Sequence, residues 1–241
     1  MPHFLIKNEE IKDDFIELND SENFFHIVKV LRTKVNEKLK FIDENKIVYE
    51  TTVVEVDKKN LKAKIEKKYK TDRILKNNLS LILATLMTDA QNLAIANATQ
   101  CGVKTIYPVI SDNCSVSEKS LNQKVEKWAK IANENFKQCE RGDIVKISEI
   151  APLKETLLKF KKENVLIFAE KYENISIENS LKDIDKTSEI VVVIGPEGGF
   201  SNEEFDFFIK ENYKLISLGK MIFKAPNAVV AGISNIVSRI E

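Results

Sequence analysis

The sequence predicts an α/β protein in which a small β-rich domain precedes a larger domain with a mainly parallel sheet. Residues 73–241 alternate short apolar runs with amphipathic helical stretches, which is the pattern of strand–helix–strand units. Residues 1–72 instead hold several short, closely spaced runs of strand type. The run at 190–194 is apolar, mostly β-branched, and followed at once by a glycine-rich turn. We therefore predict two domains, 1–72 and 73–241.

The composition indicates a globular protein without a membrane or metal signature. Hydrophobic residues make up 43% of the 241 residues and charged residues 31%. No apolar run approaches the ~20 residues of a membrane helix, and the N-terminus lacks the pattern of a signal peptide. Cys101, Cys114 and Cys139 are scattered, and His3 and His26 are the only histidines. We expect a cytoplasmic protein with no disulfide framework and no metal site.

Charge is distributed unevenly along a chain whose formal net charge is zero. Residues 1–25 carry two lysines against seven acidic residues, and residues 170–211 carry four against eleven. Residues 26–70 carry thirteen Lys or Arg against seven acidic residues, a net charge of +6. A basic segment between acidic ones is typical of a protein that presents one face to a polyanion. A lysine-rich solvated surface explains the charge equally well.

The first domain is predicted to be a small barrel of short strands. A strand is expected at 4–6, and strands at 39–43 and 46–56 flank Glu44-Asn45, a hairpin signal. Residues 61–66 alternate strictly between polar and apolar side chains. A basic small barrel is a common platform for contacts to the RNA backbone.

A short helix is predicted within this domain at residues 23–32, because its apolar residues follow the helical period. Phe24, Ile27 and Leu31 share one face of that helix, as do Phe25 and Val28. The polar stretch 67–78 has no apolar period and is predicted to be the linker to the second domain.

Strands and helices alternate along the second domain. Pro108 indicates a sheet edge or a strand end, because proline donates no backbone hydrogen bond. Pro226 stands at a permitted first-turn position of the closing helix. The predicted strands are 79–86, 105–110, 165–169, 190–194 and 215–218, and the predicted helices are 90–101, 121–141, 153–162, the stretch after Ser201, and 226–240.

The turn Gly195-Pro196-Glu197-Gly198-Gly199 is the most informative stretch of the chain. Its three glycines let the backbone take positive φ and approach a ligand closely. Ser201 and Glu204 form a capping box at the start of the next helix. The spacing is neither GxxxxGK[ST] nor GxGxxG, and Glu197 would repel a phosphate. We therefore expect a neutral or cationic ligand; an ordinary strand-to-helix turn is the alternative.

Three strand ends lead into loops that are able to line one site. They are Ala169-Glu170, the glycine turn 195–199, and the segment 218–225. In open α/β sheets ligands bind beyond such strand ends. Loops that mix glycine with apolar residues bind through backbone groups and an apolar wall, which suits an adenosine group. A plain connection remains the alternative for each loop.

Five segments resemble the RsmE-type 16S ribosomal RNA uridine methyltransferases of the SPOUT, or trefoil-knot, superfamily. The resemblance extends along most of the chain, and its most specific part is the glycine turn. The five segments are IGPEGGFSNEE (194–204), HIVKVLR (26–32), ATQCGVKTIYPV (98–109), KWAKIANENFKQCER (127–141) and LGKMIFKAPNA (218–228).

The resemblance implies an N-terminal PUA-like small β-barrel that binds RNA and a C-terminal SPOUT α/β domain with a trefoil knot. It implies a homodimer that binds S-adenosylmethionine in the knot and methylates uridine N3 in 16S ribosomal RNA of the small subunit. The expected cofactor-binding residues are Ala169, Glu170, Gly195, Pro196, Glu197, Gly198, Gly199, Leu218, Gly219, Ile222, Phe223 and Ala225.

Arg141 and Lys224 are the candidate catalytic residues. Uridine N3 must lose its proton to accept a methyl group, and a nearby cation would stabilise the anionic base. Either residue could instead contact phosphate or be an ordinary surface charge. His26, Lys29 and Arg32 are expected at the RNA surface, and a satisfied, partly buried ring is the alternative for His26.

The chain departs from the family pattern at several polar positions. Lys224 stands where the family has Arg, and the two side chains are not equivalent in bidentate contacts. Pro226-Asn227 replace Glu-Thr, Gln100-Cys101 replace Glu-Leu, Lys137 replaces Glu, and Ala90 stands where a Lys is expected. These changes leave open a relative that binds RNA without this reaction. A nucleotide enzyme whose glycine turn holds phosphates is the second alternative.

Overall fold

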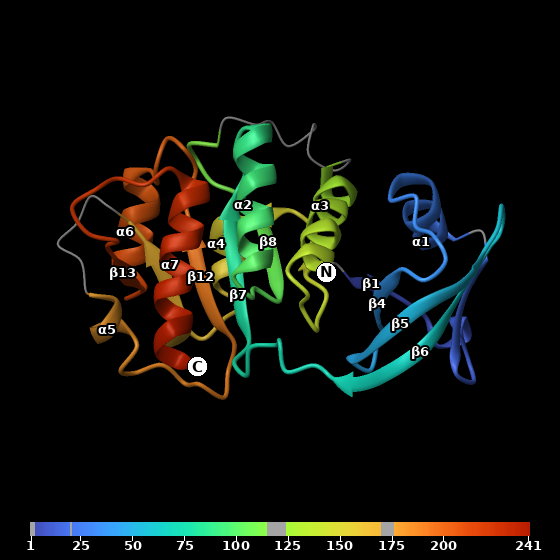
Figure 1. The fold of residues 1–241 in the computed structure, drawn as a ribbon. Coiled ribbons are helices and arrows are strands. Elements are labelled where there is room, and N and C mark those ends of the chain that lie inside the picture. Colours follow the sequence, from blue (N-terminus) through green and yellow to red (C-terminus); the bar gives the residue numbers. More distant parts are fainter. Residues whose placement is uncertain (1–2, 20, 115–123, 170–175) are drawn as a thin grey trace. The chain divides into compact units, whose positions relative to one another are not determined.

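The computed structural model describes residues 3–19, 21–114, 124–169 and 176–241. The described chain forms two compact units (Figure 1). Unit 1 holds residues 1–74 and 136–143, and unit 2 holds residues 75–135 and 144–241. Residues 136–143 belong to unit 1 although they lie far along the chain from its other residues. The domain boundary between residues 72 and 73 stays a prediction.

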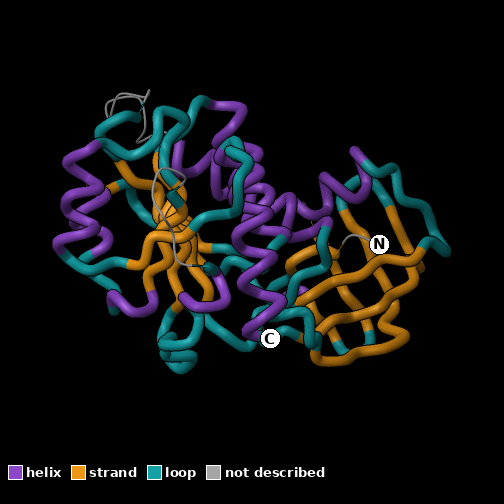
Figure 2. Tube along the Cα trace, turned by 90° about the vertical axis from the view of Figure 1, so that its left-hand side faces the viewer, coloured by secondary structure: helices purple, strands orange, loops and turns teal. Residues whose placement is uncertain are grey.

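Unit 1 is built on a curled sheet that encloses an apolar core (Figure 2). Its elements are β1 (His3–Leu5), the 3₁₀ turn η1 (Asn8–Glu10), β2 (Ile11–Lys12), β3 (Phe15–Asn19), α1 (Glu22–Phe24), the π-helical turn η2 (Phe25–Val30), β4 (Lys38–Ile42), β5 (Ile47–Val56) and β6 (Asn60–Lys70). Among the described residues the strand order is β1-β4-β5-β6-β3-β2. β1 is parallel to β4, and the other pairs are antiparallel.

The predicted helix at 23–32 is a single α-turn followed by the π-turn η2. The Leu31 N–H donates to the His26 carbonyl, five residues back, at 2.9 Å. This wider turn rotates the later side chains away from their α-helical positions. Phe24 and Ile27 are buried but Leu31 is 47% exposed, so the π-turn separates Leu31 from the face that the other two share.

Two strands of unit 1 reach beyond the sequence prediction. β6 continues to Lys70, so residues 67–70 are strand and not linker. Pairing with β5 holds these residues extended. They are extended without an apolar period, so their sequence carried no signal of a strand. β3 was missed although Ile16 and Leu18 alternate inward, since its neighbours along the chain are acidic and polar.

Unit 2 has a parallel sheet with helices on both faces (Figure 2). Its elements are β7 (Leu79–Ala84), α2 (Thr88–Gln100), β8 (Thr105–Ile110), α3 (Lys124–Gln138, its last three residues in unit 1), β9 (Lys146–Ile147), β10 (Ala151–Pro152), α4 (Leu153–Leu157), the 3₁₀ turn η4 (Lys162–Asn164), β11 (Val165–Phe168), α5 (Ile177–Ser180), β12 (Ile190–Ile194), α6 (Asn202–Lys210), β13 (Lys214–Ile216) and α7 (Ala225–Ile240). Within the described residues the strand order is β10-β8-β7-β12-β11-β13, with β9 also paired to β8.

The fully buried strand β12 separates two apolar cores. Ile190, Val192 and Ile194 face α2, α3 and α7, while Val191 and Val193 face α4 and α6. The period of two along the strand places alternate side chains on opposite faces of the sheet. Figure 1 shows α2 and α7 side by side, in line with their direct contact.

Pro108 does not mark a sheet edge, because β8 is paired on both sides. β7 pairs along one side of β8. On the other side, β9 pairs with Thr105–Ile106 and β10 with Val109–Ile110. Pro108 lies between these two short partners, where no backbone N–H is required.

Two predicted helices are shorter than expected. The helix predicted at 153–162 ends at Leu157, where the chain tightens so that Phe160 packs edge-on against Tyr107 at 5.2 Å. The helix predicted at 121–141 ends at Gln138, and its predicted start lies outside the described residues. No helix in the described parts of the chain is long and apolar enough to cross a membrane.

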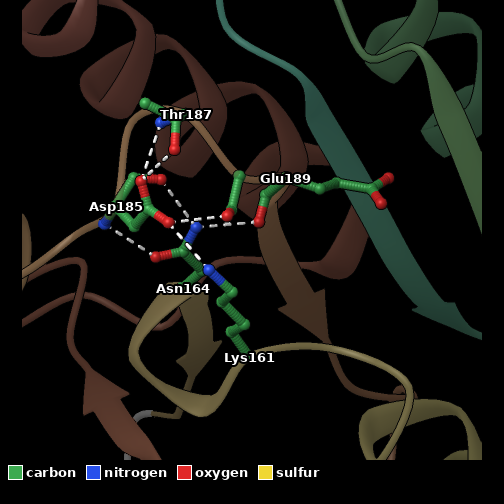
Figure 3. A network of polar contacts seen from close by, with 6 residues as sticks. Lys161, Asn164, Asp185, Thr187 and Glu189 are labelled. Carbon is green, nitrogen blue, oxygen red and sulfur yellow. Dashed lines mark hydrogen bonds and ion pairs between the residues drawn. The ribbon is translucent and has the colours of Figure 1, made fainter.

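A polar network joins the start of β11 to the segment before β12 (Figure 3). Asn164, fully buried, donates to the carbonyls of Asp185 and Glu189 at 2.9 and 3.0 Å and accepts from the Asp185 N–H at 2.9 Å. The Asp185 carboxylate accepts from the Thr187 hydroxyl and from Lys161 at 2.6 and 2.9 Å. The network aligns two neighbouring strands of the sheet at their amino ends.

Candidate active site

Three loops at the carboxyl ends of parallel strands enclose a cavity of about 670 Å³ in unit 2. They follow β11, β12 and β13, and the amino-terminal parts of α2 and α7 complete the wall. The volume lies within the range typical of small-molecule sites in proteins, and most of the lining side chains are apolar. The parallel sheet therefore positions the site, as expected for an open α/β fold.

Each of the three glycines in the glycine turn meets a different physical constraint. A Cβ on Gly195 would lie 3.0 Å from the Phe200 ring, so Phe200 packs directly on the bare backbone. Gly199 has φ +71°, a left-handed conformation that side chains disfavour. A Cβ on Gly198 would lie 3.2 Å from that of Asn113, which donates to the Gly199 carbonyl at 3.0 Å.

A buried carboxylate holds the glycine turn against the loop after β8. Glu204 is 1% exposed and accepts from the Ser111 hydroxyl at 2.8 Å, the Asp112 N–H at 3.1 Å and the Ser201 N–H at 2.8 Å. The Ser201 hydroxyl accepts from the Glu204 N–H, which completes the predicted capping box. Glu204 thus combines a helix cap with a contact to a second loop.

Glu197 has a partner that the sequence did not suggest. Its carboxylate lines the cavity and accepts from the Met87 N–H at 2.9 Å, at the N-cap of α2. An anion is favourable at a helix N-terminus, where backbone N–H groups lack partners. Glu197 therefore links the glycine turn to α2 while its charge remains at the cavity wall.

The third wall of the cavity is the segment between β13 and α7. The Ser217 hydroxyl accepts from the Gly219 N–H at 3.1 Å, and Gly219 has φ +107°. Met221 and Ile222 are 73% and 76% exposed although they line the cavity. The segment therefore presents apolar side chains to solvent at the cavity mouth.

The structure brings the expected cofactor-binding residues together. Each of those named in the sequence analysis lines the cavity except two. Gly198 packs on Asn113 instead, and Glu170 lies outside the described residues. Their role in binding a cofactor stays a prediction.

The two candidate catalytic residues lie in different units. Lys224 is exposed, lines the cavity and precedes α7 as its N-cap residue. Arg141 belongs to unit 1, where its side chain is 6% exposed and forms an ion pair with Asp143 at 2.8 Å. Only Lys224 is therefore assigned to the cavity by the structure.

The three expected RNA contacts lie on or directly after the π-turn η2 of unit 1. Lys29 and Arg32 are exposed, and Arg32 has φ +56° where the turn ends. The His26 ring is partly buried and edge-on to Phe4, with ring centroids 5.7 Å apart. This packing supports the alternative that His26 is a satisfied, partly buried ring. A contact of His26 with RNA stays a prediction.

Sequence reasoning missed the part of the cavity that α2 contributes. Asp89, Ala90 and Leu93 line the cavity together with the segment after β13. Their only sequence signal was the strand before them, which ends at the same sheet edge as β12 because the two strands are parallel neighbours. That pairing joins residues more than a hundred positions apart and has no local signature.

The charge of the wall favours a cation over a phosphate. Among the described residues that line the cavity, Asp89 and Glu197 are acidic and Lys224 is basic. Phosphate sites in proteins use arginine, lysine or a cluster of free backbone N–H groups. Among the described residues, no group of three or more His, Cys, Asp or Glu side chains is arranged so that it could hold a metal ion.

Comparison with protein families identifies the chain. A model of the RNA methyltransferase domain matches residues 73–237. The chain belongs to this RNA methyltransferase family. A model of the RNA methyltransferase PUA domain matches residues 18–66, within unit 1.

Relatives with assigned names match almost the whole chain. The ribosomal RNA small subunit methyltransferase E of Rickettsia conorii is 30% identical over 225 residues, covering 92% of this chain and 88% of that protein. Its counterpart in Mesomycoplasma hyopneumoniae is 31% identical over 229 residues, covering 92% and 93%.

A solved structure shows the same fold. The ribosomal RNA small subunit methyltransferase E of Neisseria gonorrhoeae, bound to S-adenosyl methionine, superposes with a TM-score of 0.84 at 24% identity. The match covers 99% of this chain and 97% of that one. The predicted fold class, a PUA-like unit and an α/β methyltransferase unit, is confirmed. The trefoil knot stays a prediction.

Proposed function

We propose that this chain transfers a methyl group from S-adenosylmethionine to N3 of a uridine in 16S ribosomal RNA of the small subunit. The observation that carries the proposal is the cavity of unit 2, whose walls are the glycine turn and the segment before α7, in a chain of the RNA methyltransferase family. Relatives about 30% identical over nine-tenths of the chain are named as ribosomal RNA small subunit methyltransferases.

The residues of the cavity fit the proposed cofactor. The apolar side chains at its wall suit an adenine ring, and the backbone of the turns offers amides and carbonyls to its polar edge. Asp89 and Glu197 are compatible with a sulfonium cation. The residues expected to hold the cofactor are Ala169, Glu170, those of the glycine turn, Leu218, Gly219, Ile222, Phe223 and Ala225. When bound, S-adenosylmethionine supplies an electrophilic methyl group.

The chain's own part in the reaction is alignment and charge stabilisation. Methyl transfer is an in-line displacement, so the walls of the cavity need to hold the reacting atoms in position. Among the described residues that line the cavity, Lys224 is the basic one. It stabilises the anionic uridine once N3 has lost its proton. Arg141 is the second candidate, for the same role or for a phosphate. His26, Lys29 and Arg32 contact the RNA backbone from unit 1.

A methyl-transfer assay tests this function. Purified protein, labelled S-adenosylmethionine and small ribosomal subunits lacking the modification would be combined, and the methylated position mapped. Lys224→Gln is expected to lower kcat by about 100-fold with little change in the KM for the cofactor, as for loss of one preorganised charge donor. Lys224→Arg is expected to retain activity.

Lys220→Gln is the matched control, since Lys220 is an exposed lysine of the same segment that does not line the cavity. Equal loss in both variants, or no loss in Lys224→Gln, removes Lys224 from the mechanism. Cofactor binding without transfer to any small-subunit RNA would support the alternative of an RNA-binding relative. ATP competing for the cavity would support the nucleotide enzyme.

We further propose that the protein is a homodimer. Unit 2 exposes apolar side chains on α2, on α7 and on the segment between β13 and α7: Met87 (58%), Leu93 (51%), Met221 (73%), Ile222 (76%) and Val230 (40%). An apolar surface of this kind is typical of an interface between subunits.

A ribosomal RNA substrate also fits the cytoplasmic localisation expected from the scattered cysteines.

Sedimentation velocity tests the dimer. Val230→Glu lies outside the cavity and is expected to convert the protein to a monomer, because it would bury a charge at the interface. Ile209→Glu, at a 56% exposed position on α6, should leave the dimer intact. A wild-type monomer, or equal behaviour of both variants, contradicts this interface.

A further inference from the structure

The π-turn η2 places an exposed aromatic ring beside exposed cations in unit 1. In a π-turn the hydrogen bonds close over five residues, so residues four and five apart come to lie on one side. Phe25, Lys29 and Val30 are accordingly exposed together, while Phe24 and Ile27 are buried in the core. Figure 1 shows this turn at the rim of the unit's sheet.

Phe25 is 61% exposed, the largest aromatic exposure among the described residues. Its ring takes part in none of the aromatic pairs found there, whereas the neighbouring His26 ring packs on Phe4. The core below is complete without it. Folding within unit 1 therefore does not explain an aromatic side chain at this position.

The charges that follow Phe25 along the chain have one sign. Residues 25–34 hold Lys29, Arg32 and Lys34, all exposed, and no acidic residue. Glu22 and Glu37 flank the stretch on either side. An exposed ring followed by exposed cations suits a single-stranded polyanion with flat bases, because bases stack on the ring while phosphates contact the charges.

We infer that Phe25 is a stacking platform for an unpaired RNA base, with Lys29, Arg32 and Lys34 contacting the flanking phosphates. The inference rests on the RNA substrate of the proposed function and adds a residue that reads the RNA through stacking. Phosphate contacts hold the strand in register, and the ring selects an unstacked base over a paired one.

Titration of the full-length protein with a single-stranded RNA octamer of mixed sequence, and with a duplex of the same length, tests the inference. Phe25→Ala is expected to weaken single-strand binding about 5- to 100-fold, the loss typical of one stacked base. Duplex binding should be unchanged, because its bases are already stacked. Leu158→Ala, at a position that is also 61% exposed but in unit 2, is the matched control and should bind both RNAs like the wild type.

Two further variants separate stacking from apolar contact. Phe25→Leu keeps an apolar side chain without a ring face and should bind as weakly as Phe25→Ala. Phe25→Trp should restore binding, and its fluorescence should be quenched by the single strand. The only native tryptophan, Trp128, is 3% exposed and gives a constant background. Replacing Lys29, Arg32 or Lys34 with Gln should each lower the slope of log K against log salt by about 0.7.

Four outcomes overturn the inference. Phe25→Ala could bind the octamer as the wild type does, or lose duplex and single-strand binding equally. Phe25→Leu could restore binding as well as Phe25→Trp. Phe25→Ala could bind free RNA normally but fail to methylate assembled subunits, which would assign the ring to a protein partner. Absence of methyl transfer by the wild type, with Phe25-dependent RNA binding intact, would instead reject the proposed function alone.

Discussion

Gly199 has φ +71°, and nothing lies within 4 Å of the place that a Cβ would occupy. The constraint at this position is therefore backbone conformation and not space. Gly195 shows the reverse case, since there the Phe200 ring would lie 3.0 Å from an added Cβ. Two glycines of one turn thus serve different physical ends, which their shared appearance in the sequence does not reveal.

This difference predicts how Gly199 tolerates substitution. Gly199→Asn is expected to change the free energy of unfolding by only a few tenths of a kcal/mol, since Asn adopts left-handed φ readily. Gly199→Val should cost about 2 kcal/mol, because a β-branched residue is strained there. Urea unfolding followed by Trp128 fluorescence measures both. Equal stability of the two variants would show that backbone conformation is not limiting.

Helix α6 shows how one element organises its surroundings. Its capping residue Glu204 also accepts hydrogen bonds from the loop after β8, which in turn holds the carbonyl of Gly199. Removing such a buried acceptor leaves several N–H and O–H groups without a partner. Helix start, glycine turn and neighbouring loop therefore form one cooperative element at the cavity.

Glu204→Ala is expected to destabilise the protein by about 2 to 4 kcal/mol, combining the lost cap with unsatisfied buried donors. Glu203→Ala, at the exposed neighbouring position of the same helix, should cost less than about 0.5 kcal/mol. Chemical denaturation read by Trp128 fluorescence compares them. A small effect in Glu204→Ala would mean that water replaces the carboxylate.

The polar network at the amino ends of β11 and β12 (Figure 3) is expected to make the stability of the protein depend on pH. Hydrogen bonds from the hydroxyls of Ser188 and Thr187, and the ion pair with Lys161, hold the pKa of Asp185 far below its ordinary value of 3.8. A lowered pKa in the folded state contributes stability that is present above the ordinary pKa and is lost as the pH falls below it.

The Tm difference between wild type and Asp185→Asn should therefore be widest near pH 7 and shrink below about pH 4. Asp183→Asn, at an exposed position two residues away, serves as the control and should track the wild type. A wild-type advantage over Asp185→Asn that stays constant from pH 7 to pH 3 would assign the effect to shape and not to charge.

Across the whole molecule, unit 1 is assembled from two distant stretches of chain. The His3 ring lies against Phe136, with centroids 4.9 Å apart, although 133 positions separate the two residues. Burial lowers the pKa of His3 from 6.5 to about 4. Because the unfolded chain then binds a proton more readily, this residue lowers stability progressively as the pH falls from 6.5 toward 4.

His3→Phe removes this titration while keeping a ring against Phe136. The Tm difference between His3→Phe and the wild type should therefore grow in favour of His3→Phe as the pH falls from 6.5 to 4. Above pH 6.5 this difference should stay constant. Circular dichroism melts across this range provide the measurement. Parallel Tm curves for the two proteins would show that the His3 ring titrates alike in the folded and unfolded chain.

Much of the candidate site follows from local sequence, and the remainder depends on pairing between distant strands. The glycine turn, the capping box at Ser201 and the apolar β12 all express preferences of adjacent residues. By contrast, the contact of Glu197 with Met87 arises because β7 and β12 are neighbours in the sheet. The wall contributed by α2 could not be anticipated for the same reason.

The sequence by itself determined the alternation of the main strands and helices in unit 2, the division into a β-rich part and an α/β part, and the glycine turn, because periodicity and backbone preference act within a few residues of one another. Only the tertiary structure decided the π-turn that exposes Phe25 and Leu31, the extension of β6 and the membership of residues 136–143 in unit 1. These features depend on packing and pairing between distant segments, where the free energy of the assembled fold outweighs local propensity.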